Sequence, residues 1–152
     1  MKEVHIFYSK IKDQPISLDN SLLEKLPKDL LAKNKKYLRW QDRKLNVLGK
    51  LLLIEGLKLY NLDSGYLEKL KYTKYGKPYF LDLELDFNIS HSGEYAICAL
   101  AKGMRLGVDI EKIKEIDLDS FSEVFTQNEF HNINTSKSKE ETFITIGQLK
   151  KA

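Results

Sequence analysis

The stretch Phe87–Lys112, FNISHSGEYAICALAKGMRLGVDIEK, decides the fold of this chain. Its first residues are extended and alternate in polarity up to a polar turn at Ser90–Gly93, and the apolar run Tyr95–Ala101 follows. Short apolar runs that are bounded by polar or glycine-containing turns are typical of antiparallel strands. We therefore predict strands over 87–90 and 94–101.

A third short run follows at hairpin distance, and we predict a strand over 105–111. In this run Val108 and Ile110 alternate with Asp109 and Glu111, so a strand would place both carboxylates on one face. Adjacent carboxylates repel each other, and a hard cation such as Mg²⁺ removes that repulsion because it prefers oxygen ligands. The alternative is the solvated outer face of an edge strand, where such spacing is common.

Helical patterns precede this stretch. A strand pattern over 3–8 is followed by helix patterns at about 28–38 and 40–60, and the second helix carries a broad apolar face. Gly49 inside that helix indicates close packing against a neighbour. The fold class that we expect is α+β in two layers, with a small antiparallel sheet packed against a long helix.

Composition restricts the functional classes. The 152 residues are 42% hydrophobic and 31% charged, which is typical of one soluble globular domain, and they contain no membrane-length apolar run or signal peptide. The single cysteine, Cys98, lies in an apolar strand and is expected to be a buried thiol. We expect a cytoplasmic protein.

Basic residues are concentrated in one segment. Residues 28–50 contain eight Lys or Arg and two acidic residues, although the net charge is only +3. This segment suits a polyanionic ligand or an acidic protein partner. A nucleic-acid-binding domain is the weakest alternative, because the segment lacks interleaved exposed aromatic residues.

Three motifs in this order carry a resemblance to a known family. They are GKP at 76–78, NISHSG at 88–93 and GVDIEK at 107–112. Over roughly residues 30–130 the sequence resembles the 4′-phosphopantetheinyl transferases of the surfactin-synthetase-activating type, which are single chains built from two similar halves. The resemblance implies a first half at 1–103 and an incomplete second half at 104–152. We expect self-association to cover apolar surface that an incomplete half leaves exposed.

The resemblance implies an activity and its cofactors. Enzymes of this family move 4′-phosphopantetheine from coenzyme A to a serine of an acyl, peptidyl or aryl carrier protein, and they use Mg²⁺. By resemblance Asp109 and Glu111 are metal ligands, while Ser90 and His91 meet the nucleotide and its phosphates. A turn histidine that caps a strand end is the structural alternative for His91.

Further basic and acidic positions follow from the same resemblance. Lys77 matches a residue beside the adenine and ribose, with a solvated loop lysine as the alternative, and Lys33 is a candidate contact for the 3′-phosphate. The family often has an arginine where Leu45 stands, and Arg43, Lys44 or Lys50 are candidates to replace it. Glu129 matches a family glutamate, and helix capping explains it equally well.

The C-terminal residues depart from the family. Its third motif reads Trp-Ser/Thr-x-Lys-Glu, and the matching residues here are Gly147 to Lys151, in which Lys150 matches and Lys151 replaces the glutamate. A lysine near a metal site repels the cation, so we expect this chain to be catalytically inactive as written. A reading-frame slip before Gly147 would produce this ending; an inherited degenerate terminus is the alternative. A non-catalytic protein that binds coenzyme A or a carrier protein is therefore the second functional reading.

Overall fold

The computed structural model describes residues 2–11, 23–115, 117–121 and 123–149. The chain forms two compact units, Met1–Ile110 and Glu111–Ala152, and each is described by itself. None of the helices in the described ranges is long and apolar enough to cross a membrane.

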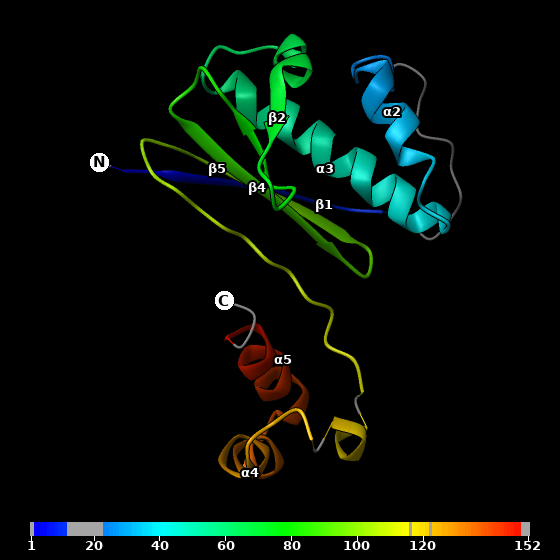
Figure 1. Ribbon diagram of the computed structural model, residues 1–152, viewed down its shortest axis with the longest axis vertical. Helices are drawn as coiled ribbons and strands as arrows, with labels where there is room; N and C mark the ends of the chain where they lie inside the picture. The colour runs from blue at the N-terminus through cyan, green and yellow to red at the C-terminus, as the bar shows by residue number, and fades with distance from the viewer. Residues whose placement is uncertain (1, 12–22, 116, 122, 150–152) are drawn as a thin grey trace. The chain divides into compact units, whose positions relative to one another are not determined.

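A three-stranded antiparallel sheet forms one layer of the first unit. Its strands are β1 (Val4–Lys10), β4 (Leu85–Ser92) and β5 (Tyr95–Lys102), in the order β1-β5-β4 (Figure 1). The central strand β5 pairs on both sides, so that Cys98 lies opposite Phe7 and Ile89. The strands predicted at 3–8, 87–90 and 94–101 are confirmed, and the nearly continuous apolar run of β5 reflects its burial on both faces.

The helix α3 (Trp40–Lys58) forms the second layer and packs across one face of the sheet. Two glycines bring it close to the strands. A β-carbon at Gly49 would lie 2.6 Å from Cγ2 of Ile89, and one at Gly56 would lie 2.4 Å from Cδ1 of Leu100. Both distances are far below van der Waals contact, so the predicted close packing at Gly49 is confirmed. The α+β fold with a long helix on a small sheet is confirmed as well.

The core lies between these two layers. Leu53 and Leu57 of α3 are fully buried against Phe87 and Leu100 of the sheet. Cys98 is buried among them as expected, and burial raises the pKa of its thiol to about 12. The thiol therefore stays protonated and unreactive at neutral pH.

Short elements border the sheet and α3. They are α2 (Lys28–Asn34), the 3₁₀ helix η1 (Ser64–Lys69) and the two-stranded sheet of β2 (Leu70–Tyr72) and β3 (Pro78–Phe80). The predicted helix 28–38 ends earlier, at Asn34. The guanidinium of Arg43 accounts for the turn that follows, because it donates to the carbonyl oxygens of Tyr37 and Leu38 at 2.8 and 3.2 Å.

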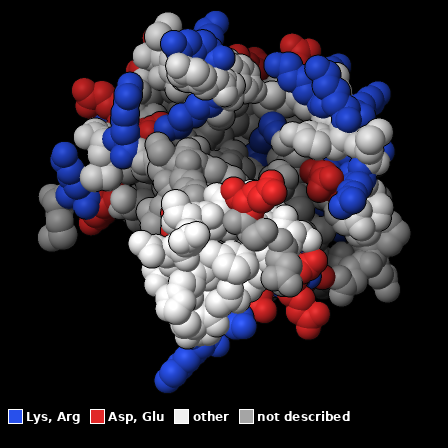
Figure 2. Space-filling model, turned by 60° about the horizontal axis from the view of Figure 1, so that its bottom comes forward, with Lys and Arg blue, Asp and Glu red and all other residues white. Residues whose placement is uncertain are grey.

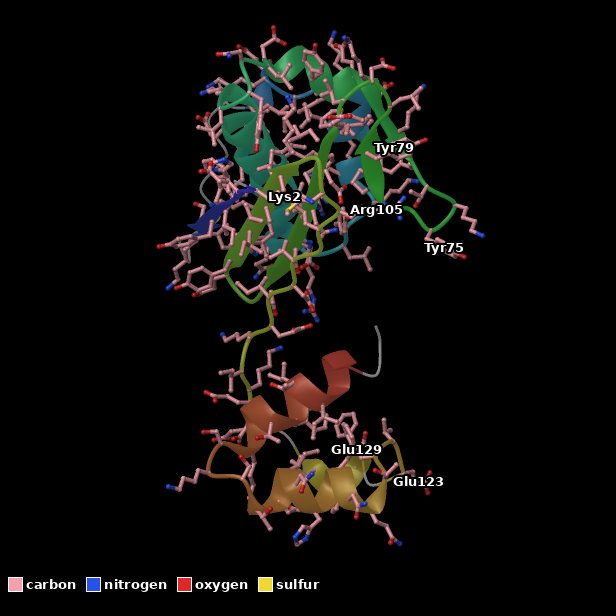
Figure 3. The ribbon with its side chains drawn as sticks, turned by 90° about the vertical axis from the view of Figure 1, so that its left-hand side faces the viewer. Lys2, Tyr75, Tyr79, Arg105, Glu123 and Glu129 are labelled. Atoms are coloured by element: carbon pink, nitrogen blue, oxygen red, sulfur yellow. The ribbon has the colours of Figure 1, made fainter. Side chains whose placement is uncertain are left out.

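The loop between β2 and β3 extends away from the core. Tyr75 stands near its tip, 85% exposed, and its ring points away from the sheet (Figure 3). Gly76 has a φ of +82°, a left-handed conformation that closes this turn without steric cost.

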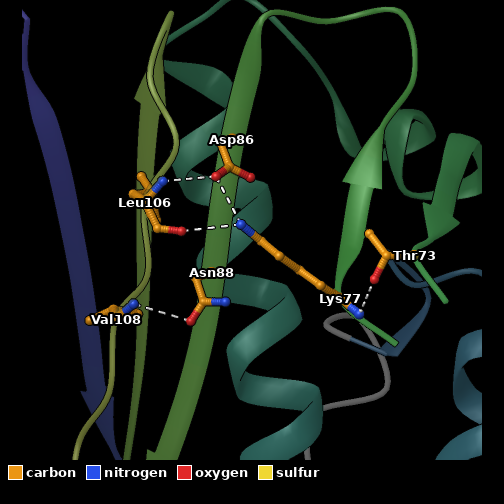
Figure 4. Close-up of polar contacts among 6 residues, drawn as sticks. All are labelled: Thr73, Lys77, Asp86, Asn88, Leu106 and Val108. Carbon is orange, nitrogen blue, oxygen red and sulfur yellow. Dashed lines mark hydrogen bonds and ion pairs between the residues drawn. The ribbon is translucent and has the colours of Figure 1, made fainter. Parts of the chain in front are cut away.

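The strand predicted over 105–111 is wrong. Residues 105–111 are extended but belong to no strand. Their backbone amides donate to side chains of β4 instead of to a neighbouring backbone (Figure 4). The three bonds join Leu106 N to Asp86 Oδ2 (2.8 Å), Val108 N to Asn88 Oδ1 (3.2 Å) and Ile110 N to Ser90 Oγ (3.3 Å). The polar residues at every second position of β4 thus hold this segment over one face of the strand, where no backbone ladder can form.

The second unit is helical. It contains the 3₁₀ helix η2 (Leu118–Phe121), α4 (Gln127–Thr135) and α5 (Lys139–Leu149). The ring of Phe143 packs edge-on against Phe121 and Phe125, each at 5.1 Å between centroids.

Candidate phosphate-binding cavity

A cavity of about 510 Å³ lies among α2, α3, the β2–β3 sheet and β4. Four basic side chains line it, namely Lys33, Lys36, Lys50 and His91. Its described lining contains no aspartate or glutamate. On the face shown in Figure 2, both basic and acidic side chains are present. The cavity therefore concentrates positive charge beyond what the net charge of the chain suggests.

Lys33 reaches the cavity from the last turn of α2. Its ammonium nitrogen lies 5.0 Å from the centre of the Tyr72 ring, within the range of a cation–π interaction. Because Tyr72 also lines the cavity, this contact directs an otherwise exposed lysine toward the cavity.

Lys50 reaches the cavity from α3, one residue after Gly49. Its ammonium donates to both the side-chain and the backbone oxygen of Asn46, one helical turn earlier. The amide of Asn46 in turn donates to the hydroxyl oxygen of Tyr37 at 3.0 Å. Burial and, as a smaller cause, the nearby charge of Lys33 together lower the pKa of Lys50 to about 8.

Arg43, Lys44 and Lys50 are the candidates to replace the family arginine at the position of Leu45, and the structure separates them. Arg43 is bonded to the carbonyl groups that precede α3, and Lys44 lies 5.9 Å from the ring centre of Trp40. Of the three, only Lys50 is among the described residues that line the cavity. Leu45 is buried in the core at 2% exposure. The sequence included Lys50 among the candidates, but only its position over the sheet separates it from the other two.

His91 and Ser90 lie on opposite faces of β4, because successive strand residues alternate. His91 faces the cavity together with Ile89. Ser90 faces the segment 105–111, where its hydroxyl donates to Oδ1 of Asp109 at 2.7 Å. The structure thus brings His91 to the lysines and Ser90 to Asp109.

The ammonium of Lys77 is held on the side of β4 that carries Asp86. It forms an ion pair with the carboxylate of Asp86 at 2.8 Å and donates to the carbonyl oxygen of Leu106 at 3.1 Å (Figure 4). Its neighbours Gly76 and Pro78 line the cavity. In this conformation the lysine ties the β2–β3 loop to the segment 105–111.

Asp109 and Glu111 have the chemistry that a Mg²⁺ site requires. Oδ1 of Asp109 also accepts from the backbone amide of Ile110 at 3.0 Å, which orients the carboxylate. Glu111 is exposed and begins the second unit. No group of three or more His, Cys, Asp or Glu side chains that could hold a metal occurs among the described residues. Each carboxylate by itself fits Mg²⁺ in donor type, and phosphate oxygens or water would have to contribute to the coordination.

Lys150 and Glu129 are the remaining predicted positions. Lys150 lies outside the described residues. Glu129 accepts from the amide and hydroxyl of Thr126 at 2.8 and 2.9 Å, and its own amide donates back to the hydroxyl of Thr126. This is a capping box at the start of α4, where Figure 3 labels Glu129, and it accounts for the glutamate structurally.

Comparison with known proteins identifies relatives along most of the chain. The sequence is 37% identical over 98 residues to the 4′-phosphopantetheinyl transferase gsp of Aneurinibacillus migulanus, covering 62% of this chain and 39% of that protein. It is 31% identical over 138 residues to the 4′-phosphopantetheinyl transferase ffp of Bacillus subtilis, covering 88% and 60%. It is 29% identical over 139 residues to the 4′-phosphopantetheinyl transferase Sfp of Bacillus subtilis, covering 89% and 61%. No family profile matches, and the chain spans about half the length of these relatives.

Proposed function

Since this chain is a homologue of the 4′-phosphopantetheinyl transferases, including the Sfp type, we propose that its site is built for coenzyme A, the donor in the transfer of 4′-phosphopantetheine to a carrier protein. The acceptor is a serine hydroxyl of an acyl, peptidyl or aryl carrier protein. Residues 1–103 correspond in this proposal to the first half of the enzyme, and residues 104–152 to the beginning of the second half.

The observation that carries the proposal is the basic cavity between α2, α3 and β4. Its volume of about 510 Å³ is in the range of small-molecule sites. Lys33, Lys50 and His91 converge there without a lining carboxylate, which suits the 3′-phosphate of coenzyme A. Tyr37 and Tyr72 add aromatic surface beside these charges, which suits the adenine.

The reaction is a phosphoryl transfer. The serine oxygen of the carrier protein attacks the phosphorus that bears the pantetheine, the pyrophosphate P–O bond breaks, and 3′,5′-ADP leaves, while the hydroxyl proton passes to a base. Mg²⁺, when bound, neutralises charge on the pyrophosphate. Asp109 and Glu111 would hold it, and the hydroxyl of Ser90 fixes the orientation of Asp109.

We further propose that the chain as written binds coenzyme A without transferring its phosphopantetheine. Lys151 stands where the family motif has a glutamate, so a positive charge replaces a group that is expected to face the metal or act as the base. Binding by the basic cavity does not require that glutamate. This non-catalytic function has the same ligand, coenzyme A, as the transferase function.

A carrier-protein loading assay followed by mass spectrometry tests the function. The 152-residue chain, coenzyme A, Mg²⁺ and an apo carrier protein are incubated beside an active phosphopantetheinyl transferase as positive control. We expect coenzyme A to bind and the carrier protein to remain apo with this chain. Efficient loading of the carrier protein would refute the expected inactivity and support a transferase function. Absence of coenzyme A binding would refute both the transferase and the non-catalytic function.

A further inference from the structure

We propose that Lys50 is an anion-binding residue of the cavity that takes up a proton when a phosphate group of the ligand binds beside it. The inference rests on the proposed coenzyme A cavity and deepens it, because it assigns one residue and a proton-linked affinity to that cavity.

The position of Lys50 is the first support. Its side chain is partly buried on α3, and its ammonium is directed by Asn46, which is itself bonded to Tyr37. All three residues line the cavity. A lysine that is held in this way needs little reorganisation to donate to an incoming anion.

The surrounding charges are the second support. The groups with charge or titratable protons that face Lys50 across the cavity are Lys33 of α2, Lys36 after it, His91 of β4, and the hydroxyl groups of Tyr37 and Tyr72. None of them is a carboxylate. Lys50 is therefore surrounded by neutral or positive groups, and the partner that this cavity lacks is an anionic ligand.

Proton uptake follows from these surroundings. Burial, and then the charge of Lys33, lower the pKa of Lys50 to about 8 in the unliganded protein. A phosphate beside the ammonium acts in the opposite direction and favours the charged form. Binding at pH 8 should then take up about half a proton at this residue, and binding at pH 7 about a tenth.

Calorimetric titration of coenzyme A into the full 152-residue chain tests the inference. Titrations at pH 8 in buffers with different ionisation enthalpies, such as Tris and HEPES, give the number of protons taken up per ligand. Lys50→Arg keeps a permanent charge, so we expect it to bind coenzyme A without this uptake. Lys50→Met should bind about tenfold more weakly or worse, because it loses a charged hydrogen-bond donor.

Two comparisons make the result specific. Lys58→Met removes a lysine of the same helix that is bonded to Glu55 and does not line the described cavity, so its uptake should equal that of the parent chain. Any contribution of His91 persists in Lys50→Arg, which separates it from the contribution of Lys50. Circular dichroism of each variant checks its folding.

The outcomes distinguish this inference from the proposed function. Coenzyme A binding with proton uptake that disappears in Lys50→Arg supports the role of Lys50. Binding without uptake at pH 8, or with the same uptake in Lys50→Arg, overturns the role of Lys50 and leaves the proposed function standing. Absence of saturable binding overturns both.

Discussion

Gly49 on α3 lies directly against Ile89 on β4, since a β-carbon at position 49 would come within 2.6 Å of the Ile89 side chain. This contact fixes the distance between the helix and the strand at the point where the cavity begins. Lys50 is the next residue on the helix, and His91 is two residues further on the strand. The close packing of the two layers therefore sets the spacing of two of the four basic groups.

Gly49→Ala is expected to destabilise the fold. The methyl group meets a β-branched side chain that is stiff about χ1, so the backbone or Ile89 must shift. We expect the free energy of unfolding to fall by about 1–3 kcal/mol, which outweighs the gain in helix propensity. Urea denaturation of both proteins measures the change. Gly107→Ala is the matched control, because a β-carbon there meets nothing within 4 Å; equal stability of the two variants would contradict the packing account.

Lys77 is expected to act in stability more than in ligand binding. Its ammonium joins Asp86 at 2.8 Å, and the Asp86 side chain is only 16% exposed. We expect Lys77→Met to lower the free energy of unfolding by about 1–3 kcal/mol, because it leaves the Asp86 carboxylate partly buried without its cation. A double-mutant cycle with Asp86→Asn measures their coupling. A large loss of coenzyme A affinity in Lys77→Met, with unchanged stability, would instead assign the lysine to the ligand.

The segment 105–111 is expected to depend on the side chains of β4. Asn88→Ala removes the acceptor of the Val108 amide, a bond of 3.2 Å. Amide hydrogen exchange at Val108 should accelerate about fivefold, because one hydrogen bond contributes about 1 kcal/mol. Exchange at Leu106, whose acceptor is Asp86, should change less. An unchanged rate at Val108 would show that the segment is held by other contacts.

The stability of the fold should depend on pH through Lys50. Its pKa of about 8 in the folded chain lies below the usual lysine pKa of 10.5, so between these pH values the unfolded chain binds more protons and stability rises with pH. Relative to Lys50→Met, the parent chain should gain about 1 kcal/mol in free energy of unfolding from pH 7.5 to pH 9. Denaturant titrations at both pH values measure this gain. The pKa of Cys98 is also shifted, but Cys98 is present in both chains, so its contribution to the pH dependence cancels. A constant difference between the two chains would mean that Lys50 titrates normally.

The sequence predicted the elements whose patterns are local. Three local patterns each indicate one element, and the structure has all three elements. The patterns are the alternation in Phe87–Ile89, the apolar run Tyr95–Ala101 and the apolar face of the long helix. The strand at 105–111 was predicted from the same alternation. It is absent because its amides find acceptors on the side chains of Asp86, Asn88 and Ser90, and a pattern within one segment does not identify its bonding partners.

In the candidate site, too, the sequence identified residues but not their long-range placement. Motifs identified Ser90, His91 and Asp109 as chemically important, but not that Ser90 and His91 face opposite sides of β4. Lys50 became distinct only when the turn before α3 placed Arg43 on carbonyl groups and Lys44 beside Trp40. The position of a lysine side chain in the fold depends on the tertiary contacts that its neighbours make. The spacing of basic residues along the sequence does not encode those contacts.

The most direct test of the account is a titration of coenzyme A into the 152-residue chain and into Lys33→Met, with Lys58→Met as control. Lys33 borders the cavity from α2 and is oriented by Tyr72, whereas Lys58 is bonded to Glu55 on the exposed end of α3. We expect saturable binding to the parent chain, unchanged affinity in Lys58→Met, and affinity reduced about tenfold in Lys33→Met. Binding that is equally strong in all three proteins, or no binding to the parent chain, would contradict the assignment of this cavity to coenzyme A.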